Sequence, residues 1–211
     1  MGRAQTWRRV HAERAALADD LAGLPEHRWA TPSLCAGLSV REVVAHLTAG
    51  ASLNPFTWMA GVIRCRFDFD KQVAMRLAEY LGSTPAETLA RFRQVGDSRT
   101  APPGPNVAWL GEAVVHAEDI RRPLGVRRAY PIETVTQVAE YYSRSDLVVV
   151  AKSRVQGLRL EAADGPFATG TGPLVRGATL ALVMAMTGRA AYCEELEGDG
   201  VATLQDRAHM S

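Results

Sequence analysis

Four side chains able to bind a metal ion lie in two apolar stretches of this chain. Glu112, His116 and Asp119 are spaced by four and three residues within GEAVVHAEDIRRPLG, residues 111–125, and His46 lies in VVAHL. In a helix, side chains three or four residues apart leave the same face about one turn apart. If the helices carrying these stretches face each other in a bundle, their inward polar groups meet in the interior, where bundles build metal sites.

Two neutral imidazoles and one carboxylate form the ligand set of many catalytic zinc sites, which keep a fourth position for water or substrate. His46, Glu112 and His116 offer this set, and such a metal ion acts as a Lewis acid. Asp119 would accept the other ring proton of His116 and fix its tautomer. The H-E-x-x-H spacing of the common metalloproteases is absent, which disfavours that class.

A simpler interpretation of these residues stays open. A buried histidine is commonly a hydrogen-bonded core residue, and Glu-x-x-x-His pairs are frequent on solvent-facing helices. The remaining histidines, His11, His27 and His209, lie in polar or terminal contexts and are expected at the surface. Cys35 is expected to be a small buried residue, since no histidine base is implied beside it.

The elements that must position these residues are predicted to be helices. Ser39 and Glu42 form a capping box, as do Thr84 and Glu87, and Asn106 can cap the helix that carries Glu112 and ends before a proline. Apolar periodicity and these signals predict helices over about 4–24, 39–53, 55–63, 70–80, 85–95, 106–122 and 131–145.

The pattern changes after residue 150. Residues 157–162 alternate apolar and charged side chains, which predicts a half-buried strand, and FATGTG is a candidate second strand. GTGPLVRG, residues 170–177, fits no full phosphate-binding pattern and is interpreted as a turn before a buried helix that ends at Gly188. We therefore expect a mainly α protein: a helical bundle over 1–150 and a small C-terminal α/β domain over 151–211.

The composition is that of an ordinary globular protein. The chain has 211 residues and a net charge of +1, so it has no electrostatic signature of a nucleic-acid or membrane-surface partner. No apolar run reaches the roughly 20 residues of a membrane helix, and no secretory signal is apparent, so we expect a cytoplasmic protein. Three widely spaced cysteines indicate neither disulfides nor a zinc knuckle. All basic residues but Lys71 and Lys152 are arginines, which is typical of GC-rich, actinobacterial genomes.

Three blocks of this sequence resemble, in the same order, the mycothiol-dependent maleylpyruvate isomerase-like branch of the DinB superfamily. They are PSLCAGLSVREVVAHLTAG, GEAVVHAEDIRRPLG and GTGPLVRGATLALVMAMTGRAA, which together span about Trp29 to Arg189. One departure is visible, since Leu38 stands where the first block of the family usually has a tryptophan. This leaves the metal-ligand positions intact and alters the expected pocket wall.

The resemblance implies a DinB-like four-helix bundle that holds a divalent metal, with zinc as the expected ion, at the positions matching His46, Glu112 and His116. It also implies mycothiol as a thiol co-substrate and a small C-terminal α/β domain that covers the site. The metal would hold the thiol as thiolate, which adds to an electrophilic carbon of a small substrate and completes an isomerisation or an S-transfer. Arg189, and after it Arg176, are the candidate catalytic cations for an anionic substrate.

Two other functions stay open on this sequence. The first is a DinB-like protein that binds a metal without turnover, as a sensor or binding module. The second is metal-assisted hydrolysis with bound water as the nucleophile. The sequence is silent on the substrate and on the oligomeric state.

Overall fold

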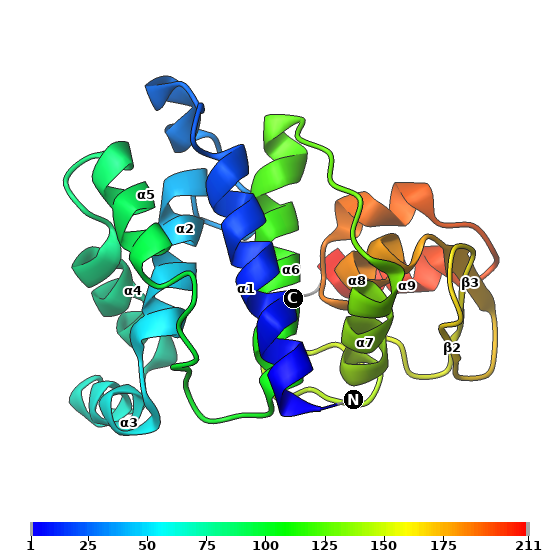
Figure 1. Ribbon diagram of the computed structural model, residues 1–211. Coiled ribbons are helices and arrows are strands. Elements are labelled where there is room, and N and C mark those ends of the chain that lie inside the picture. Colours follow the sequence, from blue (N-terminus) through cyan, green and yellow to red (C-terminus); the bar gives the residue numbers. More distant parts are fainter. Residues whose placement is uncertain (1, 210–211) are drawn as a thin grey trace. The chain divides into compact units, whose positions relative to one another are not determined.

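The computed structural model describes residues 2–209 and consists mainly of helices (Figure 1). Its contacts divide the chain into two compact units, Met1–Arg127 and Arg128–Ser211. The expected helical bundle with a small C-terminal α/β part is confirmed. In the described residues, no helix is both long enough and apolar enough to cross a membrane.

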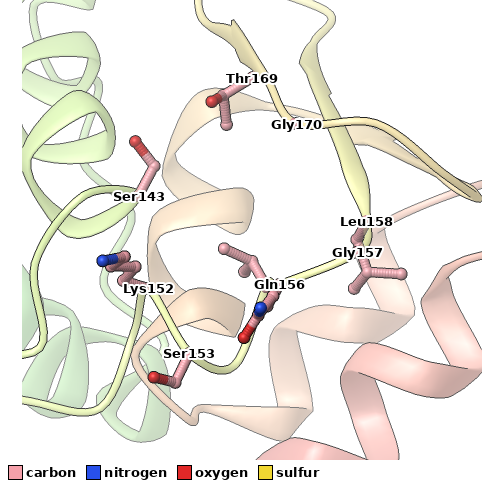
Figure 2. Close-up of a pocket in the computed structure, with 9 residues that line it drawn as sticks. Ser143, Lys152, Ser153, Gln156, Gly157, Leu158, Thr169 and Gly170 are labelled. Atoms are coloured by element: carbon pink, nitrogen blue, oxygen red, sulfur yellow. The ribbon is translucent and has the colours of Figure 1, made fainter.

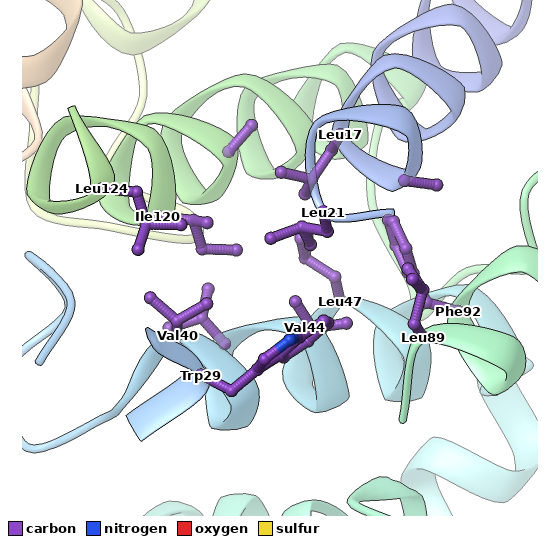
Figure 3. Close-up of a cluster of buried hydrophobic side chains, with 13 residues drawn as sticks. Leu17, Leu21, Trp29, Val40, Val44, Leu47, Leu89, Phe92, Ile120 and Leu124 are labelled. Carbon is purple, nitrogen blue, oxygen red and sulfur yellow. The ribbon is translucent and has the colours of Figure 1, made fainter. Parts of the chain in front are cut away.

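The first unit is built from six α-helices and one short 3-10 helix. Helix α1 packs on α5 and α6, and α2 packs on α4, α5 and α6. The main buried cluster takes Leu17 from α1, Val44 from α2, Phe92 from α5 and Ile120 from α6 (Figure 3). The elements are α1 (Arg3–Asp20), η1 (Glu26–Ala30), α2 (Val40–Ser52), α3 (Pro55–Arg64), α4 (Phe69–Tyr80), α5 (Pro85–Gln94) and α6 (Asn106–Leu124).

The predicted capping signals form as expected at α2 and α5. The Ser39 side chain accepts the backbone N–H of Glu42, and the Glu42 carboxylate accepts the backbone N–H of Ser39. Thr84 caps α5, which has proline at its first turn. These local hydrogen bonds satisfy backbone donors that a helix start leaves unpaired, and they therefore fix where each helix begins.

Both ends of α6 differ from the prediction. Asn106 is the first helical residue and not the cap, a position that Pro105 takes without a side-chain hydrogen bond. The helix also continues through Pro123 to Leu124 and ends at Gly125 in the left-handed conformation. Proline has no N–H, so Pro123 leaves the Asp119 carbonyl without its usual helical donor. That carbonyl accepts the Leu34 N–H at 3.0 Å instead, and the proline is therefore tolerated here.

In its described residues, the second unit combines three α-helices and one short 3-10 helix with a small sheet. Strand β1 is central, antiparallel to β2 and parallel to β3, with Leu160 opposite Val175 in the parallel pair. Buried side chains of α8 and of the sheet form its interior. The elements are α7 (Ile132–Tyr142), β1 (Arg159–Ala162), β2 (Ala168–Thr169), β3 (Leu174–Gly177), α8 (Thr179–Met186), η2 (Ala190–Glu195) and α9 (Val201–His209).

Two expectations for this part of the chain need correction. The units divide at Arg127 and not near residue 150, because α7, which the sequence predicts as part of the bundle, packs on α8. Leu174–Gly177, interpreted as part of a turn, is a strand because it pairs with β1. Because this strand forms by pairing with a segment fifteen residues away, its four residues by themselves give little indication of a strand.

Candidate metal centre

His46, Glu112 and His116 lie together inside the first unit. The Glu112 Oε2 atom is 3.3 Å from His116 Nε2 and 3.7 Å from His46 Nε2. The two imidazole rings meet edge to face, with centroids 4.9 Å apart. Helix α2 supplies the first residue and α6 the other two, so the structure brings together the three side chains that the spacing singled out.

The donor atoms are placed as a divalent ion requires. One ligand atom of each residue lies within 4.8 Å of the others. Tetrahedral zinc with bonds of about 2.0–2.2 Å holds its ligand atoms roughly 3.3–3.6 Å apart, and the separations of Glu112 Oε2 from the two Nε2 atoms are close to this range. The His46 and Glu112 side chains are 32% and 25% exposed, which leaves a side of the cluster accessible. The residues therefore fit a three-ligand site with an accessible fourth position.

Asp119 contacts this cluster through the second ring nitrogen of His116. Its side chain has no exposed surface, and its Oδ2 atom lies 2.9 Å from Nδ1 of His116. A carboxylate at Nδ1 keeps the ring proton there and leaves the Nε2 lone pair for a metal. The carboxylate–histidine pair predicted from the i, i+3 spacing is thus formed in the structure.

The electrostatics of the cluster favour positive charge. Burial alone lowers the pKa of His116, but the Glu112 charge and the hydrogen bond to Asp119 outweigh it and raise the pKa to about 10. Burial raises the pKa of Glu112, yet the two histidines hold the pKa of that carboxyl well below its usual range. The two carboxylates, one beside each ring nitrogen of His116, favour positive charge here, and a divalent cation would bring charge of the same sign to the same place.

Cys35 is a residue whose position the sequence did not predict. It is half-buried, and its Sγ, a His116 ring nitrogen and an Asp119 carboxylate oxygen all lie within 4.8 Å of one another. The expectation that no histidine lies beside this thiol is therefore wrong. Cys35 and His116 belong to segments far apart in the chain, and only the packing of the 31–38 loop on α6 places them together.

The two candidate arginines belong to the second unit. Arg176 lies on β3, where its guanidinium is 3.5 Å from the carboxylate of Glu197. Arg189 precedes η2 and donates to the backbone carbonyl of Thr187 at 2.8 Å. Each guanidinium thus has a partner within its own unit.

The second unit also has a hollow of its own, which the sequence analysis did not anticipate. Its volume is about 360 Å³, and the ammonium of Lys152 and the amide of Gln156 are the larger polar groups at its wall (Figure 2). It is lined by Ser143, Lys152, Ser153, Val155, Gln156, Gly157, Leu158, Thr169 and Gly170. None of these residues has a histidine, cysteine or carboxylate side chain, so this hollow lacks the chemistry of the first site.

The fold and the cluster define a class of protein: a helical bundle that carries two histidines and one carboxylate on two of its helices. Residues 10–104 match the family of mycothiol maleylpyruvate isomerase N-terminal domains. This match lies within the first unit, and the resemblance drawn from the sequence is confirmed. The matched range includes His46 and stops before Glu112.

Two solved structures share the fold over almost the whole chain. A mycothiol-dependent maleylpyruvate isomerase is 10% identical with a TM-score of 0.58, and a histidine-to-alanine mutant of such an isomerase is 12% identical with a TM-score of 0.62. Each similarity covers 94% of this chain and 93% of the other. No curated protein sequence matches the chain.

Proposed function

We propose that this protein is a metal-dependent enzyme that uses the thiol mycothiol to isomerise, or to transfer sulfur to, a small electrophilic and anionic substrate. The observation that carries the proposal is the convergence of His46, Glu112 and His116 on one point from two helices. The match of residues 10–104 to the mycothiol maleylpyruvate isomerase N-terminal family supports the choice of thiol, as does the likeness of the fold to mycothiol-dependent isomerases.

His46, Glu112 and His116 would hold a divalent ion, with zinc as the expected metal. Such an ion lowers the pKa of a thiol that reaches it and so supplies a thiolate at neutral pH. Glu112 contributes one negative charge to the site, and Asp119 holds the proton of His116 at Nδ1. The imidazole thus presents the same nitrogen throughout a reaction.

The substrate must bring an electrophilic carbon to the accessible side of this cluster. Arg176 and Arg189 remain our candidates for holding an anionic group of the substrate, because a guanidinium binds a carboxylate through two parallel hydrogen bonds. Activity on maleylpyruvate, compared with a panel of thiol acceptors, distinguishes isomerisation from S-transfer.

Cobalt substitution tests the metal site directly. Metal-free protein titrated with Co²⁺ is expected to show the absorption bands of a tetrahedral ion. His46→Ala and Glu112→Gln should weaken this binding by at least about tenfold, since each removes a ligand. His27→Ala is the matched control, because His27 is exposed and lies outside the cluster. Unchanged Co²⁺ binding by both ligand variants would remove these residues from the proposed site.

Anaerobic addition of mycothiol to the Co²⁺ protein tests the thiol. Cys35→Ser protein is used, so that the nearby protein thiol does not contribute to the spectrum. A sulfur-to-cobalt charge-transfer band should appear on addition of the thiol. A protein that binds Co²⁺ but shows no such band would contradict the thiol-dependent enzyme and favour a metal-binding sensor or a hydrolase.

A further inference from the structure

A second set of metal-binding side chains adjoins the first. Cys35, His116 and Asp119 offer one sulfur, one nitrogen and one oxygen atom that all lie within 4.8 Å of one another. His116 and Asp119 are buried, and Cys35 is half-buried. This set shares His116 with the first site but contains neither His46 nor Glu112.

The position of the thiol is fixed by a proline in α6. Pro123 has no N–H with which to bond the carbonyl four residues earlier in the helix, that of Asp119. This carbonyl instead accepts the backbone N–H of Leu34 at 3.0 Å. The residue adjoining Cys35 is therefore anchored to the residue that supplies the carboxylate.

The loop that carries Cys35 is also bonded to itself. The Ser33 hydroxyl accepts the Cys35 N–H at 3.1 Å and donates to the Leu38 carbonyl at 2.7 Å. The Leu38 carbonyl also accepts the Ser33 N–H at 2.9 Å. These contacts hold the loop in shape without a metal, so the sulfur is placed beside His116 in advance.

We propose that Cys35, His116 and Asp119 form a second metal site, selective for thiophilic ions such as Cd²⁺. A thiolate ligand selects soft metals, whereas the first set has only nitrogen and oxygen donors. His116 Nδ1, which faces Asp119 at 2.9 Å, is the ring nitrogen for this second site. The proposal rests on the Cys35 cluster and not on the enzymatic function of the first site.

The two sites exclude each other because they share one imidazole. A neutral imidazole has one free lone pair, so His116 binds a metal through Nε2 or through Nδ1. When a thiophilic ion binds the metal-free protein, the Cys35 thiol proton and the His116 Nδ1 proton are released to solvent, and the ring keeps one proton on Nε2. Glu112 Oε2, 3.3 Å from Nε2, is placed to accept a hydrogen bond from that tautomer. A thiophilic ion would thus inactivate the first site by taking one of its ligands.

Cadmium titration of the whole metal-free protein tests this site. Wild-type protein should show the ultraviolet sulfur-to-cadmium charge-transfer band, with saturation at one ion per chain. Cys35→Ser should lose the band, whereas Cys65→Ser should keep it, because half-buried Cys65 belongs to no donor cluster among the side chains that the structure describes. Cys35→Ala, which adds no new polar group, should behave like Cys35→Ser.

Three variants separate the two sites. His46→Ala should keep the cadmium band and lose at least about tenfold in Co²⁺ affinity. Cys35→Ser should lose the cadmium band and keep the Co²⁺ affinity. His116→Ala should lose both the cadmium band and the Co²⁺ affinity. Loading Co²⁺ first should weaken Cd²⁺ binding in the wild type. An unchanged cadmium band in both Cys35 variants, or simultaneous binding of both ions at full affinity, would overturn the proposal. If the protein shows the Cys35-dependent cadmium band but its His46, Glu112 and His116 set binds no metal, only the proposed function is refuted.

Discussion

Asp119 contacts the proposed metal site but is not one of the three proposed ligands of that site. Its carboxylate is fully buried against His116, and its backbone carbonyl anchors the loop that carries Cys35. Burial of a carboxylate is costly unless a charged or hydrogen-bonding partner compensates it. The His116 imidazole is such a partner, and the position of this acid therefore points to function at His116.

Replacing Asp119 with asparagine tests this role at the scale of the residue. Asparagine keeps the shape and one acceptor oxygen but removes the negative charge that holds the proton on Nδ1. We expect Co²⁺ affinity to fall about 10- to 100-fold, the usual cost of losing such an outer partner. Competition with a coloured chelator measures the change.

Asp97→Asn is the matched control for this measurement. The Asp97 side chain is fully exposed and lies outside both donor sets, so its substitution should leave the Co²⁺ affinity unchanged. Wild-type affinity in Asp119→Asn would show that the carboxylate does not act through His116.

Helix α2 brings His46 to the cluster, and its start is defined by the capping box of Ser39 and Glu42. One face of the helix is buried by apolar side chains, with Val40, Val43 and Val44 fully inaccessible. The fixed start and the buried face together determine the orientation of the helix about its own axis. The His46 side chain therefore has one direction, toward α6.

Removing the cap tests this at the scale of the element. Ser39→Ala deletes the side-chain acceptor for the Glu42 N–H and should lower the free energy of unfolding by about 1 kcal/mol. Urea denaturation followed by circular dichroism measures it. Ser39→Thr keeps the acceptor and should stay close to the wild type. Equal losses in the two variants would show that the hydroxyl does not stabilise this helix start as a cap.

At the scale of the whole molecule, the chain forms two compact units, and both proposed donor sets belong to the first. A ligand that binds only the folded state stabilises it by about 2.7 kcal/mol at a concentration 100 times its dissociation constant. Zinc should therefore slow the global amide exchange of α2 and α6, while α8 in the second unit exchanges as before.

Hydrogen exchange read by mass spectrometry, with and without zinc, measures this difference between the units. Glu112→Gln is the control, since loss of a ligand should abolish the zinc effect throughout the chain. Equal slowing in α8 would show that the two units unfold as one cooperative body.

Much of the bundle and the first donor set were predictable because their signals are local. Helical periodicity, the capping boxes and the four-residue spacing of Glu112 and His116 act over one or two turns, and these features appear in the structure. The path of α6 through Pro123 was missed because the partner of the Asp119 carbonyl, the Leu34 N–H, comes from a segment far away in the chain.

The sequence by itself determined which helices form and which of their faces carry histidine and carboxylate, because residues a few positions apart interact whatever the remaining chain does. Only the tertiary structure decided that α7 joins the second unit, that Leu174–Gly177 pairs as a strand, and that Cys35 lies beside His116. Each of these depends on contacts between distant segments. Such contacts arise from the packing of complete elements, which no short stretch of sequence encodes.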